Sequence, residues 1–205
     1  MGMSTKKPAL VATTLAMTLA ASLVAVLPAE AAAKPTIPNN VALKKKDVRA
    51  LGPNYVFDLG VTTTGMVTFA GQYCDTTDNG ATGAEPLPTL GRWWTWYDRA
   101  NDLDVSVDHV VTSWADSQSA LADIQNDTGH CRVGAMQYAN YAVQVADDDE
   151  FVATWDNTAV AAQRIGNNIV AITVNDWNDR IDERAQAERL LDIAAAKVAK
   201  SRRMP

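Results

Sequence analysis

Residues 160–174 read VAAQRIGNNIVAITV, and this stretch decides the fold that the sequence predicts. Its middle, Gly166-Asn167-Asn168, consists of residues that tolerate the positive φ of a tight turn between antiparallel strands. Residues 169–174 are apolar on both faces of an extended chain, as in a strand that is covered on both sides. The stretch therefore predicts a β-hairpin whose second strand lies at the centre of a sheet.

Two more strands are predicted on the N-terminal side of this hairpin. In residues 103–111, apolar side chains and His109 alternate with Asp and Ser, which is typical of a strand with one buried face. Residues 93–97 hold three tryptophans and a tyrosine in a short segment with strand character. Residues 75–92 are rich in turn residues and predict a long loop.

Two principal helices are also predicted. Residues 115–128 have helical apolar spacing, with Asp116 or Ser117 as the N-cap and Gly129 as the stop. A second helix is expected from about Asp179 to Arg202, where apolar residues recur at helical spacing. The residues of this apolar stripe are Ala187, Leu190, Leu191, Ala194 and Val198.

Between the two helices, residues 131–145 and 151–155 read as extended segments on either side of a hydrophilic turn at residues 147–150. The order is then strands, helix, strands, helix. Such an order is typical of an α+β fold. We therefore predict a mainly antiparallel β-sheet with two principal helices packed on it.

The N-terminus has the parts of an export signal. Lys6 and Lys7 provide a positive start, and residues 8–27 form an almost uncharged run rich in Ala, Leu and Val. After Pro28, small residues fit a signal-peptidase pattern, with cleavage expected near Ala31–Ala33. A retained membrane anchor is the alternative, because the run approaches the length that spans a bilayer. The weakly apolar run favours cleavage, and hence a secreted, extracellular protein without stable membrane insertion.

Removal of this signal peptide, residues 1–33, leaves 172 residues, which is enough for one domain with its own core. We interpret residues 34–50 as a linker, in which a run of lysines begins a short helix, and residues 51–205 as the domain. The mature chain has 16 basic and 23 acidic residues, a net charge of −7. This balance argues against a nucleic-acid partner, because phosphate binding depends on Lys and Arg.

Cys74 and Cys131 are the two cysteines of the chain. In an exported protein an even number of cysteines usually forms disulfides. A bond between these two would close a loop of 57 residues and stabilise the domain by about 4 kcal/mol. Two free thiols, or a metal site completed by His109 and His130, are the alternatives. Because no repeated metal-ligand spacing is present, we predict one disulfide and no metal.

The aromatic segment is the first candidate binding site. Strand alternation predicts that Trp94 and Trp96 point to one side and that Trp93 and Tyr97 point to the other. Aromatic side chains dominate recognition surfaces, so at least one of these pairs is a candidate ligand contact. The alternative is that both sides are covered and that all four residues belong to the core.

His109 and Arg164 are the other candidate ligand contacts. His109 falls on the apolar face of its strand, where it is either a core residue or a pH-sensitive contact. Arg164 could hold an anionic ligand or pair with a carboxylate such as Asp176. The acidic run at residues 147–150 lacks the spaced ligands and the glycine of a calcium loop, so we interpret it as a solvated turn.

No catalytic motif is found. The chain has no G-x-S-x-G, no H-E-x-x-H and no phosphate-binding glycine loop. A cysteine nucleophile is disfavoured because the predicted disulfide would consume both thiols. We therefore expect no catalytic residue, no cofactor and no enzymatic activity.

The region from Trp93 to Lys200 resembles the PknH-like extracellular sensor domains of actinobacterial secreted proteins, lipoproteins and receptor kinases. The resemblance is carried by the strand end at residues 110–114, the helix leading into Cys131, the hairpin at residues 164–172 and the alanine-rich final helix. It implies a sheet with packed helices, an extracytoplasmic location and a cleft for an unidentified ligand. The kinase sensors of that family look as though they carry two disulfides, whereas this chain can form one.

The sequence thus predicts a secreted, sensor-like, non-enzymatic domain. The expected partner is a small molecule, a lipid or another component of the cell envelope, held beside the aromatic strand. Two other functions remain open, namely an extracellular hydrolase acting through carboxylates and a protein-interaction or inhibitory module. A hydrolase would require two carboxylates, or a histidine and a carboxylate, in one open pocket.

Overall fold

The computed structural model describes residues 36–65, 89–101, 104–125 and 140–205. The chain divides into two units, Met1–Lys34 and Pro35–Pro205, and every described residue belongs to the second. The predicted signal peptide and the predicted disulfide partners Cys74 and Cys131 lie outside the described residues.

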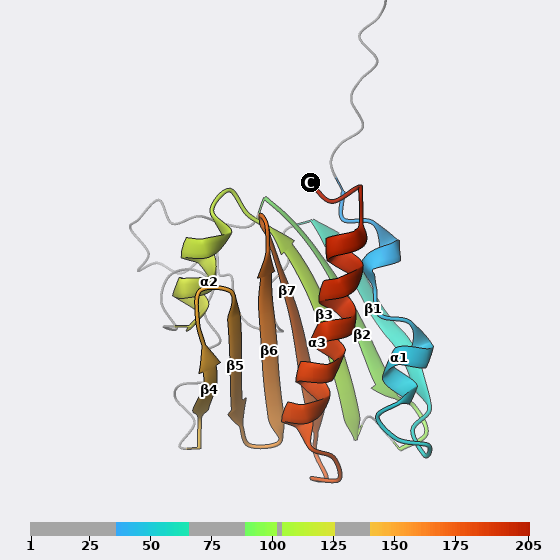
Figure 1. Cartoon of the computed structure of the whole chain (residues 1–205). Helices are drawn as coiled ribbons and strands as arrows, with labels where there is room; N and C mark the ends of the chain where they lie inside the picture. The colour runs from blue at the N-terminus through green and yellow to red at the C-terminus, as the bar shows by residue number, and fades with distance from the viewer. Residues whose placement is uncertain (1–35, 66–88, 102–103, 126–139) are drawn as a thin grey trace, which may run out of the picture. The chain divides into compact units, whose positions relative to one another are not determined.

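The described residues form one seven-stranded sheet in the order β1-β2-β3-β7-β6-β5-β4, and every neighbouring pair is antiparallel (Figure 1). The strands are β1 (Phe57–Gly65), β2 (Leu90–Asp98), β3 (Val105–Ser113), β4 (Ala142–Ala146), β5 (Glu150–Trp155), β6 (Thr158–Ile165) and β7 (Asn168–Asp176). The predicted α+β class with a mainly antiparallel sheet is therefore confirmed.

The predicted hairpin is formed by β6 and β7, in which Ile165 pairs with Asn168 across a two-residue turn. Gly166 takes a φ of 57°, the left-handed conformation that favours glycine. β7 has three strands on each side and is buried along its length except at Asn175. The central position that the apolar run predicts is thus confirmed.

The helices are α1 (Lys45–Arg49), α2 (Ser117–Gln125) and α3 (Glu183–Lys200), preceded by the 3-10 turn η1 (Asn39–Val41). The apolar stripe of α3 packs on β6 and β7, as Figure 1 shows. The helix begins later than expected, because Asp182 is its N-cap and accepts a hydrogen bond from the Ala185 amide at 2.9 Å.

The buried residues form two cores, one on each face of the sheet. The first core holds α3 and the segment Ile37–Leu51, here called the N-terminal segment, together with one face of β2, β3, β6 and β7. The second core joins α2 to the opposite face of β3, β5, β6 and β7. β7 contributes residues to both cores. This explains why its sequence is apolar on both faces.

The N-terminal segment corrects the predicted linker at residues 34–50. Val41 and Val48 are completely buried, and Leu43 is 2% exposed. The backbone of this segment is also bonded to the sheet: the Leu43 amide donates to His109 Nδ1 at 3.3 Å. From Ile37 onward the segment is therefore part of the domain core.

Lys197 attaches the N-terminal segment to α3. Its ammonium group lies 2.6 Å from the Asp47 carboxylate and donates to the Ala42 carbonyl at 2.9 Å. We expect Lys197→Met to lower the free energy of unfolding by about 1.5–3 kcal/mol, the range for hydrogen bonds to charged groups. Urea denaturation will measure this, with Lys200→Met at the exposed end of the same helix as the control. Equal losses in the two variants would contradict a structural role for the Lys197 contacts.

Candidate functional site

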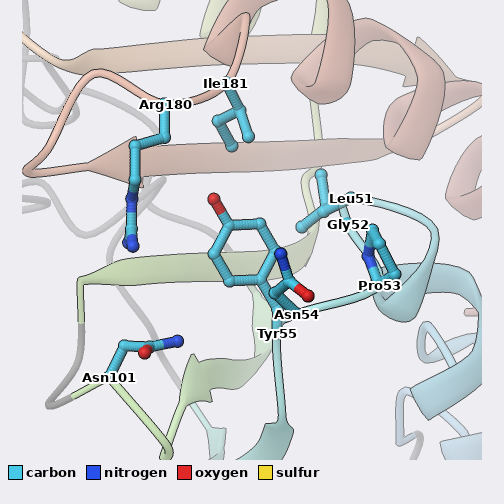
Figure 2. Close-up of a pocket in the computed structure, with 8 residues that line it drawn as sticks. All are labelled: Leu51, Gly52, Pro53, Asn54, Tyr55, Asn101, Arg180 and Ile181. Atoms are coloured by element: carbon cyan, nitrogen blue, oxygen red, sulfur yellow. The ribbon is translucent and has the colours of Figure 1, made fainter.

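A pocket of about 460 Å³ lies at one end of the sheet (Figure 2). It is lined by Leu51, Gly52, Pro53, Asn54, Tyr55, Asn101, Arg180 and Ile181. A second cavity of about 260 Å³ adjoins it, since Gly52, Pro53 and Tyr55 line both. The main pocket falls within the size range of small-molecule sites in proteins.

Three turns that are distant in sequence build this pocket. One connects α1 to β1, one connects β2 to β3, and one connects β7 to α3. Antiparallel pairing places all three at the same end of the sheet, because Phe57 pairs with Asp98 and Val105 pairs with Asp176. The register of four strands thus brings Tyr55, Asn101 and Arg180 together.

Arg180 is held in place from several sides. Its Nη2 lies 3.1 Å from Asp104 Oδ2, and its Nε lies 3.7 Å from Asp176 Oδ1. Its Cζ lies 5.3 Å from the centre of the Tyr55 ring, a cation–π geometry. In Figure 2 the Tyr55 ring occupies the middle of the pocket, with Arg180 and Asn101 on one side.

Asp176 shapes the turn that carries Arg180. This carboxylate is completely buried and accepts hydrogen bonds from the amides of Asn178 at 3.1 Å, Arg180 at 2.6 Å and Ile181 at 3.0 Å. The same turn contains Asp179 at a φ of 52°. The position of Arg180 therefore depends on a buried acidic residue at the last position of β7.

Asp98 plays a similar part in the turn that carries Asn101. It is completely buried and accepts hydrogen bonds from the Val56 amide at 2.9 Å, the Ala100 amide at 3.2 Å and the Asn101 side chain. Burial acts to raise the pKa of Asp98, but these hydrogen bonds and the charge of Arg180 outweigh it and hold the pKa below its ordinary value. Asp98 is therefore an anion at neutral pH.

The Tyr55 hydroxyl stays protonated at neutral pH. Burial raises its pKa, and the carboxylates of Asp176, Asp98 and Asp104 raise it further, while Arg180 partly offsets them. The phenol thus offers the pocket a neutral group that can donate and accept a hydrogen bond.

The structure separates the four aromatic residues of the predicted site. As strand alternation predicts, Trp94 and Trp96 share one face of β2 and are 3% and 9% exposed, within the first core. Trp93 and Tyr97 lie on the opposite face and are half-buried. Trp93 Nε1 donates to Asp108 Oδ1 at 3.1 Å, so its polar atom is already paired. Ligand binding by these residues stays a prediction, and Trp94 and Trp96 are not accessible here.

His109 lies in the first core. It is completely buried, and its ring stacks on Trp94 with 4.9 Å between centroids. Its Nδ1 accepts the Leu43 amide, so in the neutral ring the proton is on Nε2. Burial lowers the pKa of His109 to about 3, and the charge of Lys197 contributes.

Arg164 forms an ion pair with Asp149 and donates to the Asp148 carbonyl at 3.3 Å. The predicted pairing with a carboxylate is confirmed, but the partner is Asp149 and not Asp176, which lies beside Arg180. Arg164 pairs with Ile169 near the turn of the hairpin, whereas Asp176 is at the far end of β7. Within the acidic run, residues 147–149 form the solvated turn that was predicted, whereas Glu150 is half-buried and begins β5. The turn also anchors Arg164.

The sequence did not predict the pocket residues Tyr55, Asn101 and Arg180. Each lies in a turn, and the only local signal was an arginine within an acidic stretch directly after the predicted central strand. Within the described ranges, no group of three or more metal-ligating side chains comes together. Of the helices in that part of the chain, none is long and apolar enough to cross a bilayer.

The chain was compared with family models, curated sequences and solved structures. No family model and no curated protein sequence matches the chain. Among solved structures, the chain is similar to the crystal structure of the extracellular domain of PknH from Mycobacterium tuberculosis, with a TM-score of 0.49 and 13% identity. The match covers 76% of this chain and 93% of that one. At that similarity it carries no argument about family membership or function.

Proposed function

We propose that this protein is a secreted, non-enzymatic ligand-binding domain and that the pocket beside Tyr55 is its binding site. The observation that carries the proposal is the preorganisation of the pocket. Asn101 and Arg180 line it from separate turns, and each is fixed by a buried carboxylate, Asp98 or Asp176. Side chains held in this way lose little freedom when a ligand binds, which favours affinity.

The use of the nearby carboxylates supports a binding role over a hydrolytic one. Asp98 and Asp176 direct their oxygens at backbone amides and at Asn101, so those oxygens shape the turns. Asp104 pairs with Arg180. A general acid or base needs a carboxyl group within reach of substrate. These three carboxylates instead bind groups of the protein, and none of them lines the pocket.

The export signal supports the extracellular part of the proposal. Its charged start, apolar run and small residues up to Ala33 form the pattern of a cleaved secretory peptide. The acidic balance of the remaining chain fits a soluble extracellular domain that meets small molecules and not nucleic acid.

The experiment is an NMR titration of the ¹⁵N-labelled protein with fractions of a cell-envelope extract. We expect one fraction to shift the signals of Asn54, Tyr55 and Asn101 in a saturable way. Arg180→Met should weaken this binding about tenfold or more, because the guanidinium lines the pocket and positions Tyr55.

Arg184→Met is the matched control for this experiment. Arg184 is exposed on α3 and forms a surface pair with Glu188, so its loss should leave binding unchanged. Shifts that map away from the pocket, or equal weakening by both variants, would refute the pocket as the binding site.

A further inference from the structure

We infer that the ligand of this pocket is a neutral, hydroxyl-rich ring compound, that is, a saccharide, and that the pocket discriminates against anions. The inference rests on the proposed function and adds the chemical class of the ligand. It is carried by the charges around Arg180, by the neutral polar groups that line the pocket and by an exposed tryptophan at the same end of the sheet.

Carboxylates already flank the guanidinium of Arg180. Its two ends already face carboxylates, with Asp104 at 3.1 Å from Nη2 and Asp176 at 3.7 Å from Nε. One of its faces lies against the Tyr55 ring. A carboxylate or phosphate ligand that approached the guanidinium would lie next to these two carboxylates and be repelled by them.

The charges behind the pocket also oppose an anion. Asp98 and Asp176 are completely buried, and Asp104 completes a group of three carboxylates around a single arginine. The group has a net negative charge, and like charges in a partly desolvated site repel strongly. Arg180 therefore serves to compensate this acidic group and to hold Tyr55 in place.

The side chains that remain available are neutral and polar. Asn101 lines the pocket and uses its Nδ2 to donate to Asp98, so the acceptor of this side chain is its carbonyl oxygen. Asn54 offers both a donor and an acceptor, and the Tyr55 hydroxyl is protonated. Leu51, Pro53 and Ile181 add apolar surface to the lining of the pocket. Hydroxyl groups around a ring with apolar C–H faces match this mixture of donors, acceptors and apolar surface.

Trp177 provides a further aromatic surface at this end of the sheet. It is 70% exposed, the most exposed large apolar residue in the described part of the chain. Its amide donates to the Asp104 carbonyl at 3.0 Å, which places it beside the residue that pairs with Arg180. An exposed indole next to a polar pocket is a suitable surface for stacking the C–H face of a second sugar ring.

The test is a titration of the full chain with disaccharides of three charge types, followed by NMR. The neutral set contains α- and β-linked disaccharides of glucose, galactose, mannose and N-acetylglucosamine. The anionic set contains uronic-acid disaccharides, with inorganic phosphate as a sugar-free anion, and the cationic set contains glucosamine disaccharides. We expect a neutral member to shift the NMR signals of Asn54, Tyr55 and Asn101. Anionic members should bind at least about tenfold more weakly than this neutral member.

Two variants and one matched control make the test independent of sugar stereochemistry. Asp104→Asn releases one end of Arg180, so binding of phosphate and uronates should rise about tenfold, whereas Asp149→Asn, which releases Arg164 elsewhere, should not change it. Trp177→Ala should weaken the neutral disaccharide severalfold with thermal stability retained, because the side chain is 70% exposed.

The outcomes separate this inference from the proposed function. Tightest binding by an anionic or a cationic member at the pocket would overturn the saccharide inference and leave the binding function standing. The same follows if no sugar binds while an envelope fraction shifts the pocket signals. If neither sugars nor fractions shift these signals, the proposed function and the inference both fall.

Discussion

Acidification from pH 6.5 to pH 4.5 will lower the free energy of unfolding by about 2 kcal/mol through His109 alone. The folded protein keeps this histidine neutral, with a pKa of about 3, because the ring is completely buried in the first core. In the unfolded chain the same group has an ordinary pKa near 6.5. Below that pH the unfolded state binds a proton that the folded state does not. The stabilisation is therefore complete above pH 6.5 and is lost as the pH falls toward about 3.

The variant that isolates this effect is His109→Asn. An asparagine oxygen can replace Nδ1 as the acceptor of the Leu43 amide, and the new side chain does not titrate. Urea denaturation at pH 7, 5.5 and 4.5 should show a pH slope in the native protein that exceeds the slope in the variant, and the excess should approach about 1.4 kcal/mol per pH unit below pH 5.5. The carboxylates titrate in both proteins and cancel in the difference. Parallel slopes would mean that His109 is protonated in the folded protein, contrary to its buried position.

The core around β7 could be predicted from the sequence because its determinants are local. Gly166 specifies the turn, and the apolar run after it requires cover on both faces. The stripe from Ala187 to Val198 is regular enough to define α3 and its buried side. In each case the pattern within one element determines how that element packs.

β1 and the N-terminal segment could not be predicted, because neither has a regular pattern. β1 has an irregular register at Gly60, where a side chain would collide with the Tyr97 ring, and its exposed residues Leu59 and Val61 show no alternation with polar ones. The N-terminal segment buries residues at uneven spacing and looks like a linker in sequence. Its order comes from contacts with α3 and β3, which are distant in the chain.

The candidate site was missed for a related reason. The aromatic residues of β2 form an obvious cluster in the sequence, but a strand divides such a cluster between two faces, and burial takes Trp94 and Trp96 into the core. The pocket residues are scattered over three turns with no shared motif. Only the strand register brings Tyr55 and Arg180 together, and register is a property of the whole sheet.

Asp176 is the last residue of β7 and holds the turn that carries Arg180. Replacing Asp176 should therefore affect both the stability of the protein and ligand binding at the pocket. We expect Asp176→Ala to lower the free energy of unfolding by about 3–5 kcal/mol, because each buried amide left without an acceptor costs about 1–3 kcal/mol. Three backbone amides, including that of Arg180, would lose their acceptor in a region where water has little access. Asp176→Asn should also destabilise, because its NH₂ group would face an amide donor in place of an oxygen.

One control variant and one structural readout make this prediction specific. Asp192→Asn removes the same charge from an exposed position on α3 and should change stability by less than about 0.5 kcal/mol. In Asp176→Asn, if it remains folded, the Tyr55 ring signals should shift, because the turn no longer holds Arg180 over the ring. Ligand binding at the pocket should weaken in the same variant and stay unchanged in Asp192→Asn. A stable Asp176→Asn protein with native Tyr55 signals would show that Asp104 alone positions Arg180, and the turn at the end of β7 would then have no part in forming the site.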